Sequence, residues 1–230
     1  MIQIICNGKP VQLSDGIGLQ QAARQLQPTA SVTIRNGFQT NEDCILEDGD
    51  SITLIEKGVL PPRDVLEHMM AARHSPKVHE TVRRARVGIA GLGGLGSNIA
   101  AMLARTGVGQ LVLADFDVVE PSNLNRQNYF VSHLGQYKTE ATASLIHQIN
   151  PFISVETHTV RITADNAMNL FADCDVVCEA FDNPVCKAEL VSTLLSESET
   201  IRIVSGSGMA GYGSSHSLFT RKHMSRPYVC

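Results

Sequence analysis

The chain has 230 residues, 43% of them hydrophobic and 18% charged, which is enough for one domain of ordinary size and a small second one. Its 19 Lys and Arg against 23 Asp and Glu give a formal net charge of −4, so the composition makes no case for binding nucleic acid or an anionic membrane. The sequence has no apolar run of about eighteen residues, the length a membrane-spanning helix needs.

Six cysteines are scattered along the chain without the spacing of a disulfide framework. Such a pattern is typical of reduced cysteines in a cytoplasmic protein. The first residues, MIQIICNGK, turn polar too soon for a signal peptide, which agrees with a cytoplasmic location.

Residues 1–58 predict a small domain of short strands around one helix. The runs IQIICNG and KPVQL read as two strands joined at Asn7-Gly8, a dipeptide typical of tight hairpin turns. A short helix over 18–26 follows, then a strand over 31–35 that ends at Asn36-Gly37, and a last strand after Asp48-Gly49. A hairpin, a helix and further strands in this order indicate a β-grasp arrangement.

Residues 59–84 are predicted to be a linker with one helix. Pro61-Pro62 interrupts regular structure, and Arg63–His74 reads as a helix with Leu66, Met69 and Met70 on its apolar face.

A glycine-rich turn follows the first strand of the larger domain, which is predicted over residues 85–230. RVGIA (86–90) reads as a buried parallel strand, residues 97–105 as a helix that ends at Gly107 and Gly109, and QLVLA (110–114) as the next strand. The spacing GxGxxG between strand and helix, with an acid 19 residues after its last glycine, is typical of a nucleotide site. The residues that predict it are Gly91, Gly93, Gly94, Gly96 and Asp115.

A polar block, Asn123-Leu124-Asn125-Arg126-Gln127, comes soon after Asp115. In a doubly wound sheet ligands bind at this edge. An arginine there favours an enzyme that splits ATP over one that transfers hydride, because hydride transfer needs no cation over the phosphates. Asn123 and Gln127 offer neutral donors beside it.

The remaining chain alternates between helices and strands. A helix is predicted over 138–149, stopped by Asn150-Pro151, then a strand over 153–160 and a helix over 165–171. Strands over 174–180 and 201–205 flank a helix through 187–195. This alternation predicts an α/β fold with a Rossmann-like, doubly wound, mostly parallel sheet.

Four blocks in order, GLGGLGSN, DFDVVEPSNLNRQ, GQYKTEA and INP, resemble the ThiF and MoeB adenylyltransferases, relatives of the ubiquitin-activating enzymes. MAARH (70–74) and SGMAGYGSS (207–215) are similar to the shorter ThiF-like proteins that carry a ThiS-like domain at the N-terminus. The resemblance implies an enzyme that uses ATP and Mg²⁺ to adenylate the C-terminal glycine of a ThiS-like sulfur carrier for thiamine thiazole synthesis. It also implies a homodimer.

The resemblance assigns roles to particular side chains. Arg126 and Lys138 would neutralise phosphate charge, Asp182 would bind ATP and Mg²⁺, and Arg73 would reach the ATP of a partner subunit. From the residues alone other readings stay open. Lys138 could be a solvated lysine at a helix start, Arg126 and Gln127 could bridge loops, and Asp182 could cap the helix before Pro184. Asp117 could only hold the loop, and Arg73 could be a surface arginine.

The first domain departs from a sulfur carrier in one place. A carrier ends in a free Gly-Gly, whereas Glu56-Lys57-Gly58 runs on into Val59. We therefore expect this domain to be a docking or dimer-stabilising module and not the substrate.

No zinc site is expected, because the place of the first CxxC pair of many relatives reads Pro227-Tyr228-Val229-Cys230. The C-terminal part of the family's usual length is apparently missing, which leaves a thioester cysteine untested. The alternatives for function are activation of another carrier, such as the molybdopterin type, or of a small molecule, a non-catalytic carrier-binding scaffold, and a nicotinamide dehydrogenase.

Overall fold

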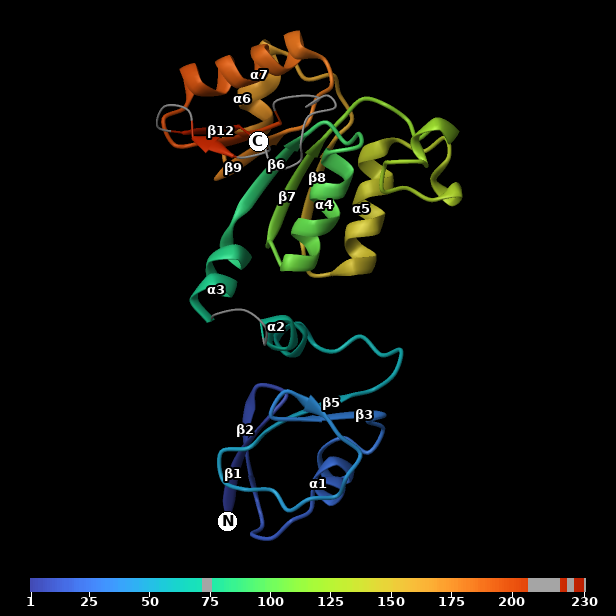
Figure 1. Cartoon of the computed structure of the whole chain (residues 1–230), viewed down its shortest axis with the longest axis vertical. Helices are drawn as coiled ribbons and strands as arrows, with labels where there is room; N and C mark the ends of the chain where they lie inside the picture. Colours follow the sequence, from blue (N-terminus) through green and yellow to red (C-terminus); the bar gives the residue numbers. More distant parts are fainter. Residues whose placement is uncertain (72–75, 207–219, 223–225, 230) are drawn as a thin grey trace. The chain divides into compact units, whose positions relative to one another are not determined.

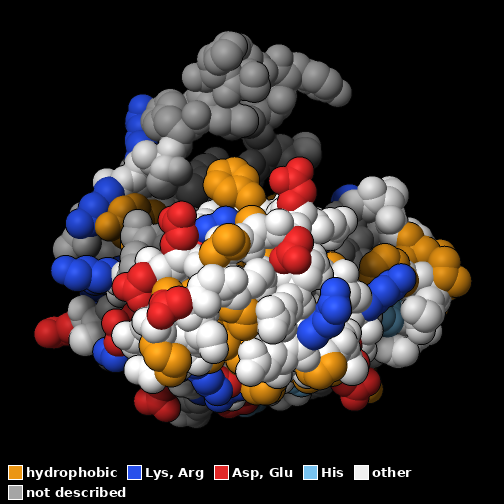
Figure 2. Space-filling view, turned by 90° about the horizontal axis from the view of Figure 1, so that it is seen from below, with side chains coloured by type: hydrophobic (Ala, Val, Ile, Leu, Met, Phe, Trp, Pro, Cys, Tyr) orange, Lys and Arg blue, Asp and Glu red, His pale blue; other side chains and the backbone are white. Residues whose placement is uncertain are grey.

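The computed structural model describes residues 1–71, 76–206, 220–222 and 226–229 (Figure 1). The chain forms two compact units, Met1–His79 and Glu80–Cys230. No helix in the described part of the chain is long and apolar enough to cross a membrane. On the face seen in Figure 2, acidic and basic side chains are interspersed, as the small net charge leads one to expect.

The first unit contains a five-stranded sheet in the order β2-β1-β5-β3-β4. Its parallel pair, β1 with β5, is flanked by antiparallel neighbours, and the helix α1 covers one face. Ile4, Leu19, Ile52 and Leu54 form the centre of this small core. The predicted β-grasp fold is confirmed, with elements β1 (Ile2–Cys6), β2 (Lys9–Leu13), α1 (Leu19–Leu26), β3 (Val32–Arg35), β4 (Phe38–Gln39) and β5 (Ser51–Ile55).

Both predicted tight turns of this unit are confirmed. Asn7 and Gly8 have φ of 49° and 80°, and Asn36 and Gly37 have φ of 50° and 86°. Two successive left-handed residues make the two-residue turn whose twist matches that of the flanking strands. The strand β4 after the second turn is too short for a sequence pattern to reveal.

Two helices follow in the segment predicted as linker and single helix. The first, α2 (Arg63–Ala71), begins where the sequence predicts, and residues 72–74 of that prediction lie outside the described part. Val65 is its buried side chain, whereas Leu66, Met69 and Met70 are only half-buried. The second, α3 (Pro76–Arg84), was not predicted, because its sequence PKVHETVRR carries little apolar pattern.

The second unit is built on a seven-stranded sheet in the order β11-β12-β10-β9-β6-β7-β8. Every neighbouring pair is parallel except β11 with β12. The predicted mostly parallel sheet is therefore confirmed, and two strands that were not predicted extend it at one end. Its strands are β6 (Arg86–Ala90), β7 (Gln110–Ala114), β8 (Ser154–His158), β9 (Val176–Glu179), β10 (Arg202–Ser205), β11 (Arg221–Lys222) and β12 (Pro227–Val229).

Helices cover both faces of this sheet (Figure 1). α4 (Gly96–Thr106) and α5 (Lys138–Ile149) share one core with Ile89 and Leu113, and α6 (Ala164–Phe171) and α7 (Pro184–Glu197) share another with Val112 and Val177. Alternate strand residues thus point to opposite layers. The short 3₁₀ helices η1 (Pro121–Asn123) and η2 (Val131–His133) lie in the long connection between β7 and α5.

The glycine turn between β6 and α4 brings helix and strand into close contact. Gly91 has φ of 89°, a left-handed conformation that disfavours other residues. A Cβ on Gly96 would lie 1.9 Å from the carbonyl oxygen of Gly91. The third glycine of the motif is therefore required by packing.

We expect Gly96→Ala to destabilise the second unit, since backbone has to move to admit the methyl group. The cost should be about 3 kcal/mol, the upper end of ordinary overpacking. That corresponds to a fall in melting temperature of about 6–12 °C for a chain of this size. Thermal denaturation followed by circular dichroism measures it.

The matched control is Gly94→Ala in the same turn, where the nearest atom to an added Cβ is Arg126 Cδ at 3.7 Å. This variant should melt close to the wild type. Equal melting temperatures for the two variants would contradict the packing argument.

Candidate functional site

A cavity of about 560 Å³ lies at the carboxyl ends of the central parallel strands. Its walls come from the turns that follow β6, β7 and β9 and from the start of α5. Sequence positions that are far apart therefore meet in one place, as the fold predicts for a ligand site. The residues of the sequence-based site that line it are Gly91, Gly93, Gly94, Asp115, Asn123, Arg126, Gln127, Lys138 and Asp182.

Two predicted site residues are not placed in this cavity. Gly96 lies against the Gly91 carbonyl and the Ala180 side chain and does not line the wall. Arg73 lies outside the described residues.

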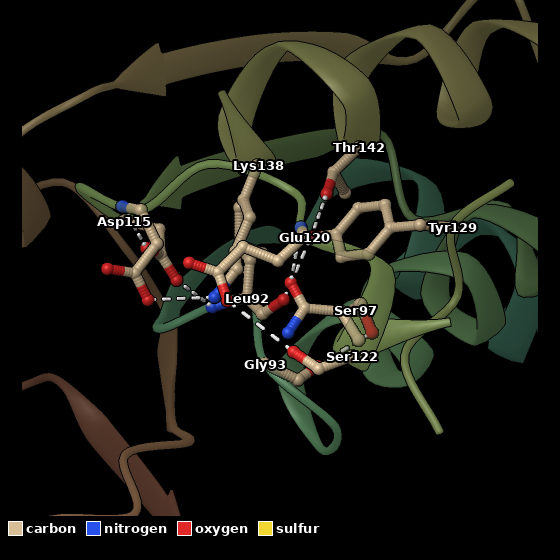
Figure 3. A network of polar contacts seen from close by, with 11 residues as sticks. Leu92, Gly93, Ser97, Asp115, Glu120, Ser122, Tyr129, Lys138 and Thr142 are labelled. Atoms are coloured by element: carbon tan, nitrogen blue, oxygen red, sulfur yellow. Dashed lines mark hydrogen bonds and ion pairs between the residues drawn. The ribbon is translucent and has the colours of Figure 1, made fainter. Parts of the chain in front are cut away.

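Asp115 is a buried carboxylate that holds the turn around it (Figure 3). Its Oδ2 accepts a hydrogen bond from Leu92 N at 2.6 Å, and its Oδ1 accepts one from Asp117 N at 2.8 Å. Burial raises the pKa of this carboxyl above its ordinary value. Asp115 therefore joins the glycine turn to the loop after β7 at the cavity wall.

Lys138 is buried, with 6% of its surface exposed, although it begins a helix. Its Nζ donates to Asp117 Oδ2 at 2.8 Å. The alternative of a solvated lysine at a helix start is therefore wrong. Asp117 does hold the loop, and it does so by fixing this cation at the cavity.

The polar block surrounds the glycine turn. Arg126 is exposed, and its Nη1 donates to the carbonyl of Ser122 at 3.1 Å and to Asn125 Oδ1 at 2.9 Å. The Oε1 atom of Gln127 is buried and has no hydrogen-bond partner among the described residues. An unpartnered buried acceptor at a cavity wall costs free energy unless a ligand or water satisfies it.

Asn123 is also buried, and its Oδ1 accepts a hydrogen bond from Glu120 N at 2.9 Å. This bond closes the short helix η1 at the edge of the cavity. Arg126 and Asn123 thus shape the loop and line the cavity together, so the loop-bridging reading of Arg126 is compatible with a ligand role.

Asp182 is exposed at the wall and makes no hydrogen bond or ion pair with any described residue. The N-cap of α7 is Asn183, whose Oδ1 accepts from Val185 N and Cys186 N at 2.9 and 3.2 Å. The alternative that Asp182 caps the helix is therefore wrong. A free carboxylate fits Mg²⁺, which takes one or two protein carboxylates together with phosphate oxygens.

Several wall residues escaped the sequence analysis. Phe116 and Arg161 line the cavity together, with the guanidinium carbon 5.8 Å from the ring centre. Cys186, in the first turn of α7, also lines it. The sequence offers a signal only for Phe116, which stands between Asp115 and Asp117.

The other two cysteines in the described part of this unit, Cys174 and Cys178, carry no sign of a site. Burial raises the pKa of the Cys174 and Cys178 thiols to about 11, so both stay protonated at neutral pH. Within the described ranges, no group of three or more His, Cys, Asp or Glu side chains could hold a metal ion.

We expect Asp115→Ala to weaken nucleotide binding at least about tenfold, because a hydrogen bond to a charged group contributes ~1.5–3 kcal/mol. The wild-type affinity should also fall with falling pH, since an acid at this place in the motif is expected to accept a hydrogen bond from a ribose hydroxyl in its ionised form. Because burial raises the pKa of Asp115, this loss should begin at a higher pH than for an exposed aspartate. Calorimetry across pH measures both effects.

The stability of the fold depends on pH in the opposite direction. Because burial raises the pKa of Asp115, this group makes the folded state less stable as the pH rises through that pKa. Acid therefore does not lower nucleotide affinity by unfolding the chain through Asp115. An unchanged dissociation constant in folded Asp115→Ala would exclude the ribose role.

Comparisons with known proteins identify two families along the chain. Residues 66–230 match the ThiF family, and residues 2–58 match the ThiS-like ubiquitin family. The chain is similar to "Adenylyltransferase and sulfurtransferase UBA4" of Candida glabrata, with 32% identity over 131 residues, which is 56% of this chain and 30% of that protein. It is similar to "Probable adenylyltransferase/sulfurtransferase MoeZ" of Mycobacterium tuberculosis, with 40% identity over 103 residues, covering 44% and 26% of the two chains. The chain thus spans less than a third of the length of these relatives.

Among solved structures, the chain resembles the tRNA N6-threonylcarbamoyladenosine dehydratase TcdA of E. coli in complex with ATP. The TM-score is 0.63 at 28% identity, and the match covers 71% of this chain and 68% of TcdA. The family match covers the whole cavity described above and most of the chain. The chain therefore belongs to the ThiF family and carries a ThiS-like ubiquitin domain before its family domain.

Proposed function

We propose that this protein is an ATP-dependent adenylyltransferase that activates the C-terminal glycine carboxylate of a ThiS-type sulfur carrier. One observation carries the proposal. Two cations, Arg126 and Lys138, and a free carboxylate, Asp182, line the same cavity as the glycine turn. A nucleotide triphosphate needs both kinds of group, and the ATP complex of the related TcdA supports the choice of ATP.

The chemistry follows from charge. A carrier carboxylate oxygen attacks the α-phosphorus of ATP. The bond between this phosphorus and the oxygen that bridges it to the β-phosphorus breaks, and pyrophosphate leaves with the electron pair. The product is an acyl adenylate. Negative charge builds up on the phosphates during this step, so preorganised cations contribute most to catalysis and no covalent nucleophile is needed.

The ribose would bind at Asp115 and the phosphates over Gly91, Gly93 and Gly94, where backbone can approach closely. Asn123 and Gln127 would donate to the phosphates from the facing loop. Mg²⁺, held by Asp182, would offset phosphate charge when bound.

The carrier's identity is part of the proposal. The ThiS-like domain supports a ThiS-type carrier and a role in thiamine thiazole synthesis. The similarity to UBA4 and MoeZ, both named sulfurtransferases, favours a different ubiquitin-like carrier as the second candidate. We propose that residues 1–58 dock or stabilise a homodimer, that residues 85–230 form the catalytic domain, and that the protein works in the cytoplasm.

The test is exchange of radioactive pyrophosphate into ATP by the full chain with a panel of purified carriers of the ThiS and molybdopterin types. Exchange that depends on a ThiS-type carrier is expected. Exchange that depends only on a molybdopterin-type carrier would favour the second candidate function, activation of a different ubiquitin-like carrier.

Calorimetry tests which nucleotide the protein binds and so which class of enzyme it belongs to. MgATP should bind and NAD should not. NAD binding without ATP binding would restore the dehydrogenase alternative, and ATP binding without exchange with any carrier would favour a scaffold.

A further inference from the structure

A buried carboxylate immediately precedes the wall residues Ala180, Phe181 and Asp182 without lining the cavity itself. Glu179 is the last residue of β9, and its side chain is fully buried. Strand pairing places it beside Ala90 of β6 and Ser205 of β10. An ionised group in such a place is costly unless it is paired and hydrogen-bonded.

Three contacts satisfy this carboxylate. Oε1 accepts a hydrogen bond from Phe181 N at 2.7 Å. Oε2 accepts from Lys187 Nζ and from Ser205 Oγ. Glu179 thus joins the turn after β9, the helix α7 and the end of β10.

The turn between Glu179 and α7 is short and is held at both ends. Ala180 N donates to the Ala90 carbonyl at 2.9 Å, and Phe181 N donates to Glu179. On the other side Asn183 caps α7. Asp182 lies between these fixed points, and its own side chain has no partner in the described part of the chain.

From this arrangement we infer that Glu179 is a positioning residue, which sets the place of the Asp182 carboxylate through the amide of Phe181. The inference rests on the proposed function, in which Asp182 meets Mg²⁺ and the triphosphate. The competing reading is a buried ion pair that serves folding alone. Such pairs can often be replaced by apolar residues without loss of stability.

Two paired variants separate these readings. Glu179→Gln with Lys187→Met keeps an oxygen to accept from Phe181 N, lets the amide face Ser205 Oγ and removes the unpaired ammonium. Glu179→Leu with Lys187→Met is equally neutral but lacks the acceptor. The two differ in the contacts to Phe181 N and to Ser205 Oγ. Ser205→Ala removes only the second contact and serves as the control, which should keep the wild-type Mg²⁺ gain.

The measurement is calorimetric binding of α,β-methylene ATP to the full chain, with and without Mg²⁺, and of AMP. In the wild type Mg²⁺ should tighten binding of the analogue. The Gln/Met pair should keep this gain. In the Leu/Met pair the gain in analogue affinity from Mg²⁺ should be at least about tenfold smaller, because losing one contact to a charged group has an effect of that size. AMP affinity should stay near the wild-type value.

Combining the Leu/Met pair with Asp182→Asn shows whether the pair lowers the Mg²⁺ gain by displacing Asp182. Residues that act through one group give non-additive losses. Leu/Met in the Asp182→Asn background should therefore cause no further loss of the Mg²⁺ gain. Additive losses, or equal Mg²⁺ gains in folded Gln/Met and Leu/Met chains, would overturn the inference.

Folding of each variant is checked by circular dichroism. If the Leu/Met pair does not fold, Glu179→Asp replaces it, because it keeps the charge but withdraws the carboxylate by one methylene from Phe181 N. Additive losses with Asp182→Asn, or a Mg²⁺ gain equal to that of the Gln/Met pair, would then overturn the inference. Absence of ATP binding by the wild type would overturn the proposed function and this inference together, whereas normal wild-type binding with unaffected variants overturns the inference alone.

Discussion

Asp182→Asn is expected to suppress pyrophosphate exchange by ~10²–10³, the usual effect of removing one preorganised electrostatic group. The melting temperature should stay near that of the wild type, because Asp182 is exposed and has no partner among the described residues. AMP affinity should also be kept, since AMP lacks the charge that Mg²⁺ offsets. A group that acts only on the triphosphate can therefore lower exchange without changing AMP affinity.

The neighbouring residue provides the control. Asn183→Ala removes the side chain that caps α7. It should cost about 1 kcal/mol of stability, as loss of an N-cap typically does, and lower exchange far less than Asp182→Asn does, because the Asp182 carboxylate itself remains. The two adjacent variants should thus separate stability from catalysis. Full exchange activity in Asp182→Asn would refute the metal assignment.

The second large effect is expected for Arg126→Ala. Its guanidinium lines the cavity beside Gly94 and is held by the Ser122 carbonyl. A cation so placed is preorganised for the charge that develops on the triphosphate, and an arginine can bind phosphate with two parallel hydrogen bonds. Exchange should fall by ~10²–10³ while AMP affinity is nearly unchanged.

Arg126→Lys should recover only part of the rate, because a lysine keeps the charge but not the fork. Arg105→Ala, which removes an exposed arginine from the last turn of α4, is the matched control for net charge and should exchange at the wild-type rate. If Arg126→Ala and Arg105→Ala behave alike, the phosphate role of Arg126 is wrong. Lys138 is a poorer probe, because its removal also breaks the buried pair with Asp117.

Short-range patterns along the chain were enough to predict most of the elements. Asn7-Gly8 and Asn36-Gly37 impose left-handed turns whatever surrounds them. The helix α5 has the bounds that its sequence predicts, because its apolar spacing and Asn150-Pro151 act within a few residues. The glycine spacing around Gly91 likewise reflects a local need for close approach. The glycine motif with Asp115 and the polar block predicted seven residues of the cavity wall, and the family resemblance added Lys138 and Asp182.

Tertiary structure decided what depends on partners far along the chain. Lys138 is buried because Asp117, 21 residues earlier, neutralises it, and no local pattern predicts that pair. The helix α3 is held beside Gly109, although its sequence carries little apolar pattern.

The environments of Asp182 and Glu179 were decided in the same way. Asp182 is left free because Asn183 caps the helix. Glu179 reads in the sequence as one more acid, yet the register between β9 and β10 buries it against Ser205, 26 residues later. Spacing along the chain determined the turns and helices, whereas strand pairing and helix capping determined that Glu179 is buried and that Asp182 has no partner in the described part of the chain.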